Sequence, residues 1–372
     1  MRIETLAIHA GGEPDKETGA ITPPIHLATT FQHGPAGERV AGFEYQREAN
    51  PTQTRLEECL AAMEQGEAAL AFASGMAAMN GFLECLSAGS EVLIPQDCYG
   101  GLRSLGQEFL PERGVATRSV NMGDLDAVRA AISETTKCIW LETPSNPLLE
   151  VSDIQAVAKI CREKNILLVC DNTFATPILQ QPLLLGADVV MHSTTKYFGG
   201  HSDVMGGALI FAKRDALYEK VAHRRHITGN ILSPFSAWLI LRGARSLAAR
   251  MAWHCTNASQ IAEFLSSHAA IEKVNYPGLV SHLNHYVAKK QMRDYGGMMS
   301  IQVKGGRETT LAFAGKLKLF INATSLGGCE SLIEHRASVE GPNPVSAQNL
   351  LRISVGLEHV DDLIEDLRQA LS

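Results

Sequence analysis

Short apolar runs alternate with helical stretches between about residues 56 and 235, and this alternation constrains the fold more than any other feature. Six runs are continuous and bounded by polar turns: 69–72, 92–94, 138–141, 167–170, 189–191 and 208–211. Continuous apolar runs of this length are typical of strands buried on both faces of a sheet. Because helical stretches lie between them, the pattern predicts an α/β domain with a mainly parallel sheet.

The helix expected over 153–164 is the clearest of these stretches. Its apolar residues recur at helical spacing, and Ser152 and Gln155 have the spacing of a capping box. Asn165 follows Lys164 and is a typical residue at a helix end.

The two ends of the chain differ from this middle part. Residues 1–55 contain Gly11-Gly12 and Pro23-Pro24, which interrupt any periodicity, so we expect an irregular arm that packs on another body such as a neighbouring subunit. Residues 236–372 carry a helical stretch at 236–268, weaker strands at 299–303 and 350–355, and an acidic helix at 360–371. A chain of 372 residues exceeds what one core usually supports. The predicted division is an arm (1–55), a large α/β domain (56–235) and a smaller C-terminal α+β domain (236–372).

Charge and cysteine usage exclude several classes of protein. The net charge of -7 argues against nucleic acid or an anionic membrane as the main partner. No apolar run approaches the roughly 18 residues that span a bilayer, and the first residues do not resemble a signal peptide. The eight cysteines form no C-x-x-C pair and are expected to be buried thiols in a reducing, cytoplasmic compartment. The close histidine pairs, His223/His226 and His282/His285, have no clustered carboxylates or cysteines, so no metal site is predicted.

Chemically distinctive residues follow three of the predicted strands. Asp171 follows 167–170, Lys196 lies shortly after 189–191, and Ser74-Gly75 follows 69–72 where a helix begins. In an open α/β sheet, ligands collect beyond the carboxyl ends of strands. Each residue also has an ordinary explanation on its own: a turn cap for Asp171, a surface position for Lys196, and a simple strand–helix turn for Ser74-Gly75.

Together these residues match the requirements of pyridoxal 5'-phosphate (PLP). A carboxylate keeps the pyridine nitrogen protonated, a lysine forms a Schiff base with the aldehyde, and a helix start with hydroxyls binds the phosphate. Tyr99 is the candidate to stack on the ring, although it could instead be a half-buried core tyrosine. We therefore expect the cofactor on Lys196.

The sequence resembles the Cys/Met-metabolism enzymes of the fold-type I PLP-dependent family over nearly its whole length. The longest matching run is residues 188–202, from Asp188 through His192-Ser193-Thr194-Thr195-Lys196-Tyr197 to Ser202. Further motifs occur in the family order: Tyr45-x-Arg47, Asn50-Pro51-Thr52, Ala73-Ser74-Gly75-Met76-Ala77, Tyr99-Gly100-Gly101, Glu142-x-Pro144-Ser145-Asn146-Pro147, Asp171-Asn172-Thr173-Phe174, Ser325-Leu326-Gly327-Gly328 and Arg352-Ile353-Ser354.

The resemblance implies a role for each candidate residue. Lys196 would carry the cofactor and move protons, Asp171 would pair with the pyridine nitrogen, and Tyr99 would stack on the ring and assist loss of the γ-substituent. The resemblance further implies cofactor contacts from Gly75, Met76, Thr173, Ser193 and Thr195, phosphate contacts from Tyr45 and Arg47 of a neighbouring subunit, and substrate contacts from Asn146, Ser325, Glu330 and Arg352. It also implies a homotetramer, built as a dimer of dimers that share active sites.

Within this family the sequence most resembles cystathionine γ-lyases and γ-synthases, because Glu330 matches the glutamate of both. We take γ-elimination, which yields cysteine, 2-oxobutanoate and ammonia, as the first hypothesis. Cystathionine γ-synthase is the alternative, followed by methionine γ-lyase and O-acetylhomoserine sulfhydrylase.

Two departures concern the rim of the site. The γ-acting enzymes carry an arginine where this chain has Ser104; Arg103 lies one position early, and one residue turns a helical side chain by about 100°. After Glu334-His335 the chain reads 336–341 as Arg-Ala-Ser-Val-Glu-Gly, where the family usually has Pro-Ala-x-Met-Thr-His. We expect these positions to influence which substrate enters.

Two other classes of function remain as alternatives. A nucleotide-binding oxidoreductase would need a Gly-x-Gly-x-x-Gly motif after a strand, and the sequence has none. A catalytically inactive protein on the PLP fold is the other alternative, although all the residues expected to hold the cofactor are present.

Overall fold

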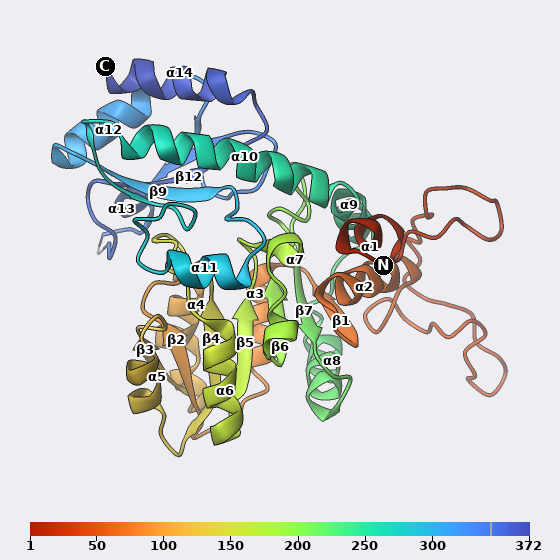
Figure 1. Ribbon diagram of the computed structural model, residues 1–372. Coiled ribbons are helices and arrows are strands. Elements are labelled where there is room, and N and C mark those ends of the chain that lie inside the picture. The colour runs from red at the N-terminus through yellow and green to blue at the C-terminus, as the bar shows by residue number, and fades with distance from the viewer. Residues whose placement is uncertain (343) are drawn as a thin grey trace.

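A seven-stranded sheet forms the centre of the large domain and confirms the predicted α/β fold (Figure 1). The computed structural model describes residues 1–342 and 344–372. The strand order is β1-β7-β6-β5-β4-β2-β3. Strand β7 runs opposite to the other six strands, so its pairings with β1 and β6 are antiparallel and the remaining pairings are parallel. The strands are β1 (Ala68–Phe72), β2 (Glu91–Pro95), β3 (Ala116–Val120), β4 (Thr136–Glu142), β5 (Leu167–Asp171), β6 (Val189–His192) and β7 (Gly207–Phe211).

All six predicted apolar runs lie in these strands, and both faces of the sheet are buried. On β5, for example, Val169 packs into the core on one face, whereas Leu168 and Cys170 pack into the core on the other. Strand β3 was not predicted, because its sequence Ala-Thr-Arg-Ser-Val is polar and largely exposed at the edge of the sheet. Edge strands bury fewer side chains, so the apolar signal used for prediction is weak there.

Helices cover both faces of this sheet. They are α2 (Pro51–Glu64), α3 (Gly75–Leu83), α4 (Gly100–Ser104) with a π-helical turn (Leu105–Phe109), α5 (Leu125–Ala131), α6 (Ile154–Lys164), α7 (Thr176–Leu179), α8 (Ala216–Thr228) and α9 (Pro234–Ala244). The predicted cap of α6 was wrong by one residue: Asp153, not Ser152, accepts the hydrogen bond from the Ala156 amide at 3.0 Å. Asn165 ends α6 in the left-handed conformation, as predicted.

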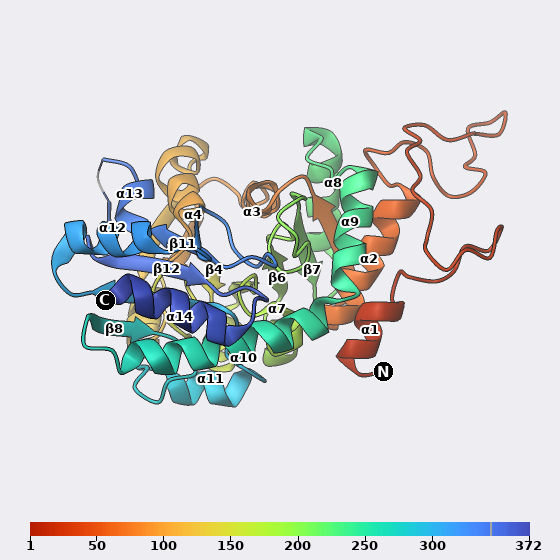
Figure 2. The same ribbon diagram turned by 90° about the horizontal axis from the view of Figure 1, so that it is seen from above.

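A second, five-stranded sheet is formed by residues after 270. Its order is β10-β11-β12-β9-β8, and α10, α12 and α14 lie beside it in Figures 1 and 2. The predicted helix at 236–268 is two helices, because α9 ends at Ala244 and α10 begins at Leu247. The remaining elements are α10 (Leu247–Ser266), β8 (Ile271–Asn275), α11 (His285–Gln291), β9 (Met298–Val303), α12 (Gly306–Lys316), β10 (Ile321–Asn322), β11 (Leu332–His335), α13 (Arg336–Val339), β12 (Leu350–Ser354) and α14 (Val360–Leu371). The domain boundaries at 55 and 235 stay a prediction.

The N-terminal arm extends away from the rest of the chain (Figures 1 and 2). It is not irregular throughout, because α1 (Ile3–His9) packs on α2 and α10, and α2 already begins at Pro51. Between them, Ile21, Leu27 and Val40 are 64–70% exposed. Large apolar side chains this exposed on an extended segment are typical of a surface that another molecule covers.

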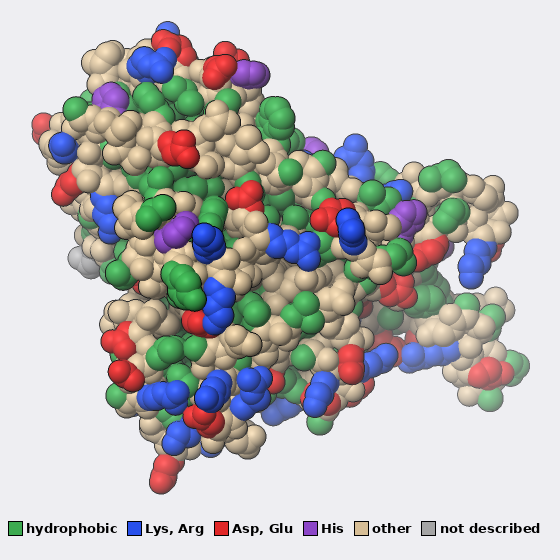
Figure 3. Space-filling model, in the orientation of Figure 1, with side chains coloured by type: hydrophobic (Ala, Val, Ile, Leu, Met, Phe, Trp, Pro, Cys, Tyr) green, Lys and Arg blue, Asp and Glu red, His purple; other side chains and the backbone are tan. Residues whose placement is uncertain are grey.

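The described residues contain no helix that could cross a membrane. All eight cysteines are free thiols, and all but Cys329 are buried. Lys and Arg side chains are interspersed with Asp and Glu on the face seen in Figure 3. The cytoplasmic location stays a prediction.

Candidate active site

A cavity of about 790 Å³ lies at the carboxyl ends of β4, β5 and β6, and residues of the second sheet form part of its wall. It brings together most of the residues predicted from the sequence: Gly75, Met76, Tyr99, Asn146, Asp171, Thr173, Ser193, Thr195, Lys196, Ser325 and Arg352. Ligands of open α/β sheets bind at this edge because the carboxyl ends of parallel strands converge there.

Lys196 lies in the turn that follows β6, with its amine directed to the C-terminal domain. Its Nζ donates to the Ser325 hydroxyl at 2.7 Å. Burial and the nearby Arg352 cation lower the pKa of Lys196 to about 8, while Glu334 partly opposes them. A much larger fraction of this amine is therefore neutral at pH 7 than in an exposed lysine, and the neutral amine is the nucleophilic form.

Asp171 ends β5 and lies beside Glu142, which ends β4. Burial raises the pKa of Asp171, although hydrogen bonds from Thr173 and the charge of His192 act in the opposite direction. Burial and the neighbouring Asp171 raise the pKa of Glu142 well above its usual range, although the Tyr99 amide donates to Glu142 at 2.9 Å. Two buried carboxyl groups stay ionised together only if a cation lies close, which suits a protonated pyridine nitrogen.

The start of α3 forms the other end of the cavity. Ser74 caps the helix by accepting from the Ala77 amide at 3.0 Å. A Cβ added to Gly75 would lie 3.0 Å from the Ser193 Cβ, so glycine allows the helix start to approach Ser193 closely. The unpaired amides of a first helical turn, next to a serine hydroxyl, are suited to a phosphate.

Two threonines support this end of the site by different contacts. Thr173 donates its amide to Asp171 at 2.9 Å, and its hydroxyl accepts from the Ser193 amide at 2.9 Å. The Thr195 hydroxyl instead donates to the Gly206 carbonyl at 3.1 Å and accepts from the Gly206 amide at 3.0 Å. An amine, a buried carboxyl pair and a helix start with hydroxyls therefore fit the three polar parts of PLP.

Tyr99 precedes α4, and its side chain lines the cavity with 43% of its surface exposed. It belongs to none of the hydrophobic core clusters, which favours a role in the cavity over the alternative of a core tyrosine. A Cβ at Gly101 would lie 2.5 Å from a ring carbon of Tyr99 and 2.5 Å from the sulfur of Met76. The glycine thus leaves room for the Tyr99 ring, and a larger residue there would displace it.

Arg352 lies on β12 and is almost fully buried. Its Nη1 donates to the Asn146 side chain at 3.0 Å, and its Nη2 donates to the Ser325 carbonyl at 2.9 Å. Glu334, directly opposite on β11, forms an ion pair with it. A guanidinium held this way presents a planar fork that suits a carboxylate.

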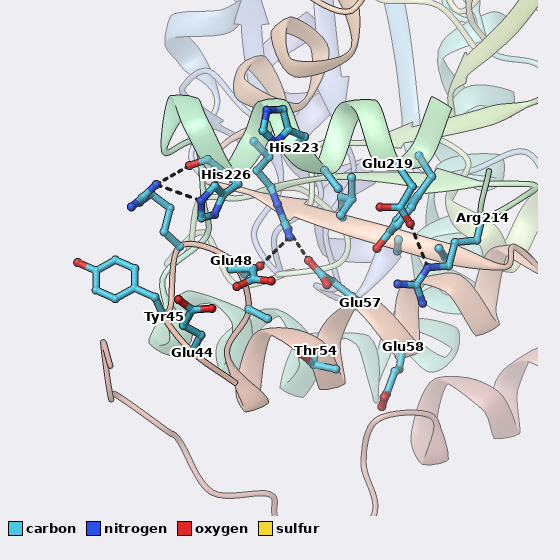
Figure 4. A pocket seen from close by; sticks show the side chains of 18 of the residues that line it. Glu44, Tyr45, Glu48, Thr54, Glu57, Glu58, Arg214, Glu219, His223 and His226 are labelled. Carbon is cyan, nitrogen blue, oxygen red and sulfur yellow. Dashed lines mark hydrogen bonds and ion pairs between the residues drawn. The ribbon is translucent and has the colours of Figure 1, made fainter. Parts of the chain in front are cut away.

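Tyr45 and Arg47 do not line this cavity. They lie on a second cavity of about 1010 Å³ between the arm, α2 and α8 (Figure 4). Arg47 donates to the His226 carbonyl at 3.0 Å and lies over the Tyr45 ring at 5.4 Å. In Figure 4 the Tyr45 ring points outward, away from Glu57 and Arg214.

Glu330 does not line the active cavity either. Its carboxylate accepts a hydrogen bond from Ser202, in the loop that follows Lys196. Both Arg103 and Ser104 line the cavity, so the shift of the arginine by one position does not remove it from the wall.

Two carboxyl groups of the cavity wall, Glu142 and Glu334, were not predicted as site residues, whereas Arg103, Arg336 and Glu340 belong to the two rim segments singled out in the sequence. Glu142 carried a signal in the sequence, because it follows the apolar run 138–141 as Asp171 follows 167–170. Glu334 joins the site through its pairing with Arg352 across two antiparallel strands, which the spacing along the chain does not indicate. Among the described residues no group of three or more His, Cys, Asp or Glu could hold a metal ion.

Comparison with known proteins agrees with this site. The family model of Cys/Met metabolism PLP-dependent enzymes matches residues 4–372. The chain is 47% identical over 373 residues to a cystathionine gamma-synthase of Mycobacterium tuberculosis, covering 99% of this chain and 96% of the relative. It is 42% identical over 379 residues to a cystathionine gamma-lyase of Bacillus subtilis, covering 100% of this chain and 99% of the relative.

The fold agrees equally well with a solved structure. The crystal structure of metB from Corynebacterium glutamicum superposes with a TM-score of 0.97 at 44% identity, covering 100% of this chain and 98% of that chain. With the family model matching almost the whole length, this chain belongs to the Cys/Met metabolism family of PLP-dependent enzymes and uses pyridoxal 5'-phosphate as its cofactor.

Proposed function

We propose that this enzyme acts at the γ-carbon of an amino acid derived from homoserine or homocysteine. The choice of the γ-carbon rests on the relatives, which are named cystathionine gamma-synthase and gamma-lyase. The observation that supports an amino-acid substrate is the arrangement of Lys196, Ser325 and Arg352. The Lys196 amine donates to Ser325, whose carbonyl in turn accepts from Arg352. A substrate whose α-carboxylate binds Arg352 would therefore hold its α-carbon near an amine with a pKa of about 8.

We assign a separate role to each of three residues. Arg352, held by Asn146, binds and orients the α-carboxylate. Lys196 takes the α-proton and returns protons to the carbon skeleton, because its lowered pKa lets it act as both base and acid near neutral pH. Tyr99 lines the cavity on the side of α4 and assists departure of the γ-substituent. Bound PLP supplies the electron sink for the negative charge that develops on the substrate.

The choice between elimination and replacement rests on the relatives. Our sequence-based preference was cystathionine γ-elimination. The relative at 47% identity is named a γ-synthase and the relative at 42% a γ-lyase, and this order favours replacement. We therefore propose γ-replacement of an O-acylhomoserine by cysteine first, and γ-elimination of cystathionine second.

The arm supports a shared active site between two subunits. Tyr45 and Arg47 lie outside the cavity of their own chain, and Tyr45 is 41% exposed. We propose that they reach the phosphate end of the neighbouring subunit's site, and that two such dimers form a tetramer. Light scattering, which gives the mass of the assembly, tests the tetramer. The PLP affinity of Arg47→Ala tests the shared site, because this variant should bind PLP more weakly.

A substrate panel tests the reaction. The holoenzyme is incubated with an O-acylhomoserine plus cysteine, with cystathionine, with methionine, and with O-acetylhomoserine plus sulfide, and both cystathionine and 2-oxobutanoate are measured. Formation of cystathionine supports replacement, and 2-oxobutanoate from cystathionine supports elimination. Turnover of only methionine, or only O-acetylhomoserine with sulfide, would reject both cystathionine reactions, and turnover of none of the four would reject action at the γ-carbon.

A further inference from the structure

Four side chains of alternating charge run along the C-terminal wall of the active cavity. They are Arg352, Glu334, Arg336 and Glu340, and all four line the cavity. Glu334 pairs with both arginines, and Arg336 also pairs with Glu340. The side chains are between 4% and 14% exposed, so water screens their interactions weakly.

The Glu334 carboxylate is shared unequally between the two arginines. Its Oε1 accepts a hydrogen bond from Arg336 Nη1 at 3.1 Å. Its Oε2 makes the closer contact, an ion pair with Arg352 Nη2. Arg352 donates hydrogen bonds to the Asn146 side chain and to the Ser325 carbonyl. Each oxygen of the Glu334 carboxylate therefore contacts a different arginine, Oε1 contacting Arg336 and Oε2 contacting Arg352.

This sharing matters because the Glu334 carboxylate can compete with the substrate α-carboxylate for Arg352. A buried carboxylate beside Arg352 repels a second carboxylate and can occupy the donors that the substrate needs. A second guanidinium on the far side offsets this charge. Arg336 has that position, and it stands where the resembling family motif has proline.

Glu340 keeps Arg336 from moving fully onto Glu334. Arg336 Nη2 donates to Glu340 at 3.3 Å, and Glu340 itself accepts from the Val345 amide at 2.9 Å and the Ser346 hydroxyl at 2.6 Å. Burial raises the pKa of Glu340, but the bonds from Ser346 and the charge of Arg336 outweigh it and lower the pKa overall. Glu340 is thus a charged, fixed anchor for the guanidinium.

We propose that Arg336 is a positioning residue that holds Oε1 of Glu334, so that Glu334 engages Arg352 through Oε2 alone and Arg352 keeps donors free for the α-carboxylate of the substrate. The inference rests on the proposed role of Arg352. It predicts a general effect on amino acids that carry a carboxylate, whatever their side chain. If Arg336 instead contacted the distal end of the substrate, its removal would affect long substrates alone.

The test compares two small amines that differ by a carboxylate. Glycine and methylamine are titrated into the holoenzyme, and binding is followed by the visible absorbance of the cofactor and by calorimetry. We expect Arg336→Ala to weaken glycine about tenfold, which corresponds to about 1.4 kcal/mol, and to leave methylamine unchanged. Arg336→Lys should retain most of the affinity, because it keeps the charge. Glu334→Gln added to Arg336→Ala should restore glycine binding.

The matched control is Arg307→Ala. Arg307 contacts Ser338 and Gln348 on the same rim but makes no ion pair with a described carboxylate and does not line the cavity. Its removal should leave glycine affinity unchanged. Thermal unfolding and cofactor content establish that each variant is folded and loaded.

Three results would overturn the proposal: wild-type glycine affinity in Arg336→Ala, no restoration by Glu334→Gln, or a loss confined to cystathionine. If Arg336→Ala does not fold, the single variant Glu334→Gln tests the proposal. The proposal requires this variant to bind glycine more tightly than the wild type, and unchanged or weaker binding contradicts the proposal. If Arg352→Ala binds glycine with wild-type affinity, Arg352 is not the carboxylate site of the proposed function. If the enzyme shows no turnover at the γ-carbon, the proposed reaction fails but the glycine result still stands.

Discussion

Lys196 should destabilise the cofactor-free fold, and the size of this effect follows from its pKa. The pKa is about 8 in the folded chain against 10.5 for an ordinary lysine. Each unit corresponds to about 1.36 kcal/mol, so the 2.5-unit difference amounts to about 3 kcal/mol. The folded pKa is the lower one, so the penalty is complete below pH 8, is lost as pH rises from 8 to 10.5, and is absent above that.

The assay is urea unfolding of the cofactor-free protein with Lys196→Met, which keeps the length of the side chain and removes its charge. We expect the free energy of unfolding to rise by up to about 3 kcal/mol at pH 7, and the gain to fall to roughly half at pH 9.5. Lys289→Met, at an exposed position of α11, serves as the control and should change stability by less than about 0.5 kcal/mol. No gain at pH 7, or the same gain at both pH values, would refute the reasoning.

Three further predictions concern the loaded enzyme. The holoenzyme should be yellow, and Lys196→Ala should still bind PLP but lose activity by about 10²–10⁴-fold; near-normal turnover would remove Lys196 from the mechanism. Gly75→Ala should weaken PLP binding roughly tenfold in an absorbance titration, because its Cβ would crowd Ser193, whereas Gly315→Ala, in open space, should not; equal affinities would contradict the close approach. Arg103→Ala should raise KM for cystathionine about tenfold but leave KM for O-acetylhomoserine unchanged, since Arg103 lines the cavity and its guanidinium donates to the Gln96 carbonyl at 3.5 Å rather than to a carboxylate. Equal losses for both substrates would exclude a distal contact.

The sequence predicts those parts of the fold and site that depend on local pattern. Lys196 and Asp171 follow continuous apolar runs, and the parallel arrangement of buried strands places their ends together. The order of the strands and the position of β3 depend on long-range pairing, which apolar runs do not encode. The cap of α6 was misplaced by one residue because Ser152 and Asp153 are both good N-cap residues and the local pattern does not choose between them; the Asp153 side chain accepts from the Ala156 amide.

The parts of the site that come from the C-terminal domain were predictable only by resemblance. Arg352 and Glu334 are paired across β11 and β12, but nothing in their local sequence indicates that they face Lys196. The same holds for Ser325, whose hydroxyl accepts from Lys196 across 129 positions of sequence. Contacts of this kind require the packing of two domains, and a periodic pattern within either domain carries no information about it.

Two ionisable groups of the cavity lack an ion-pair partner within the described part of the chain, unlike buried charged groups elsewhere in the fold. Arg225 is also buried, but it pairs with the partly buried Glu57 and further donates to the Ala71 carbonyl. Lys196 and Asp171 make no ion pair among the described residues, although each is largely buried. Burying an ionisable group without a partner costs stability unless a ligand supplies the counter-charge. Asp171, which a pyridinium would complement, and Lys196, which would react with the cofactor aldehyde, are therefore the groups that the described residues leave without an ionic partner, which distinguishes a binding site from a structural ion pair.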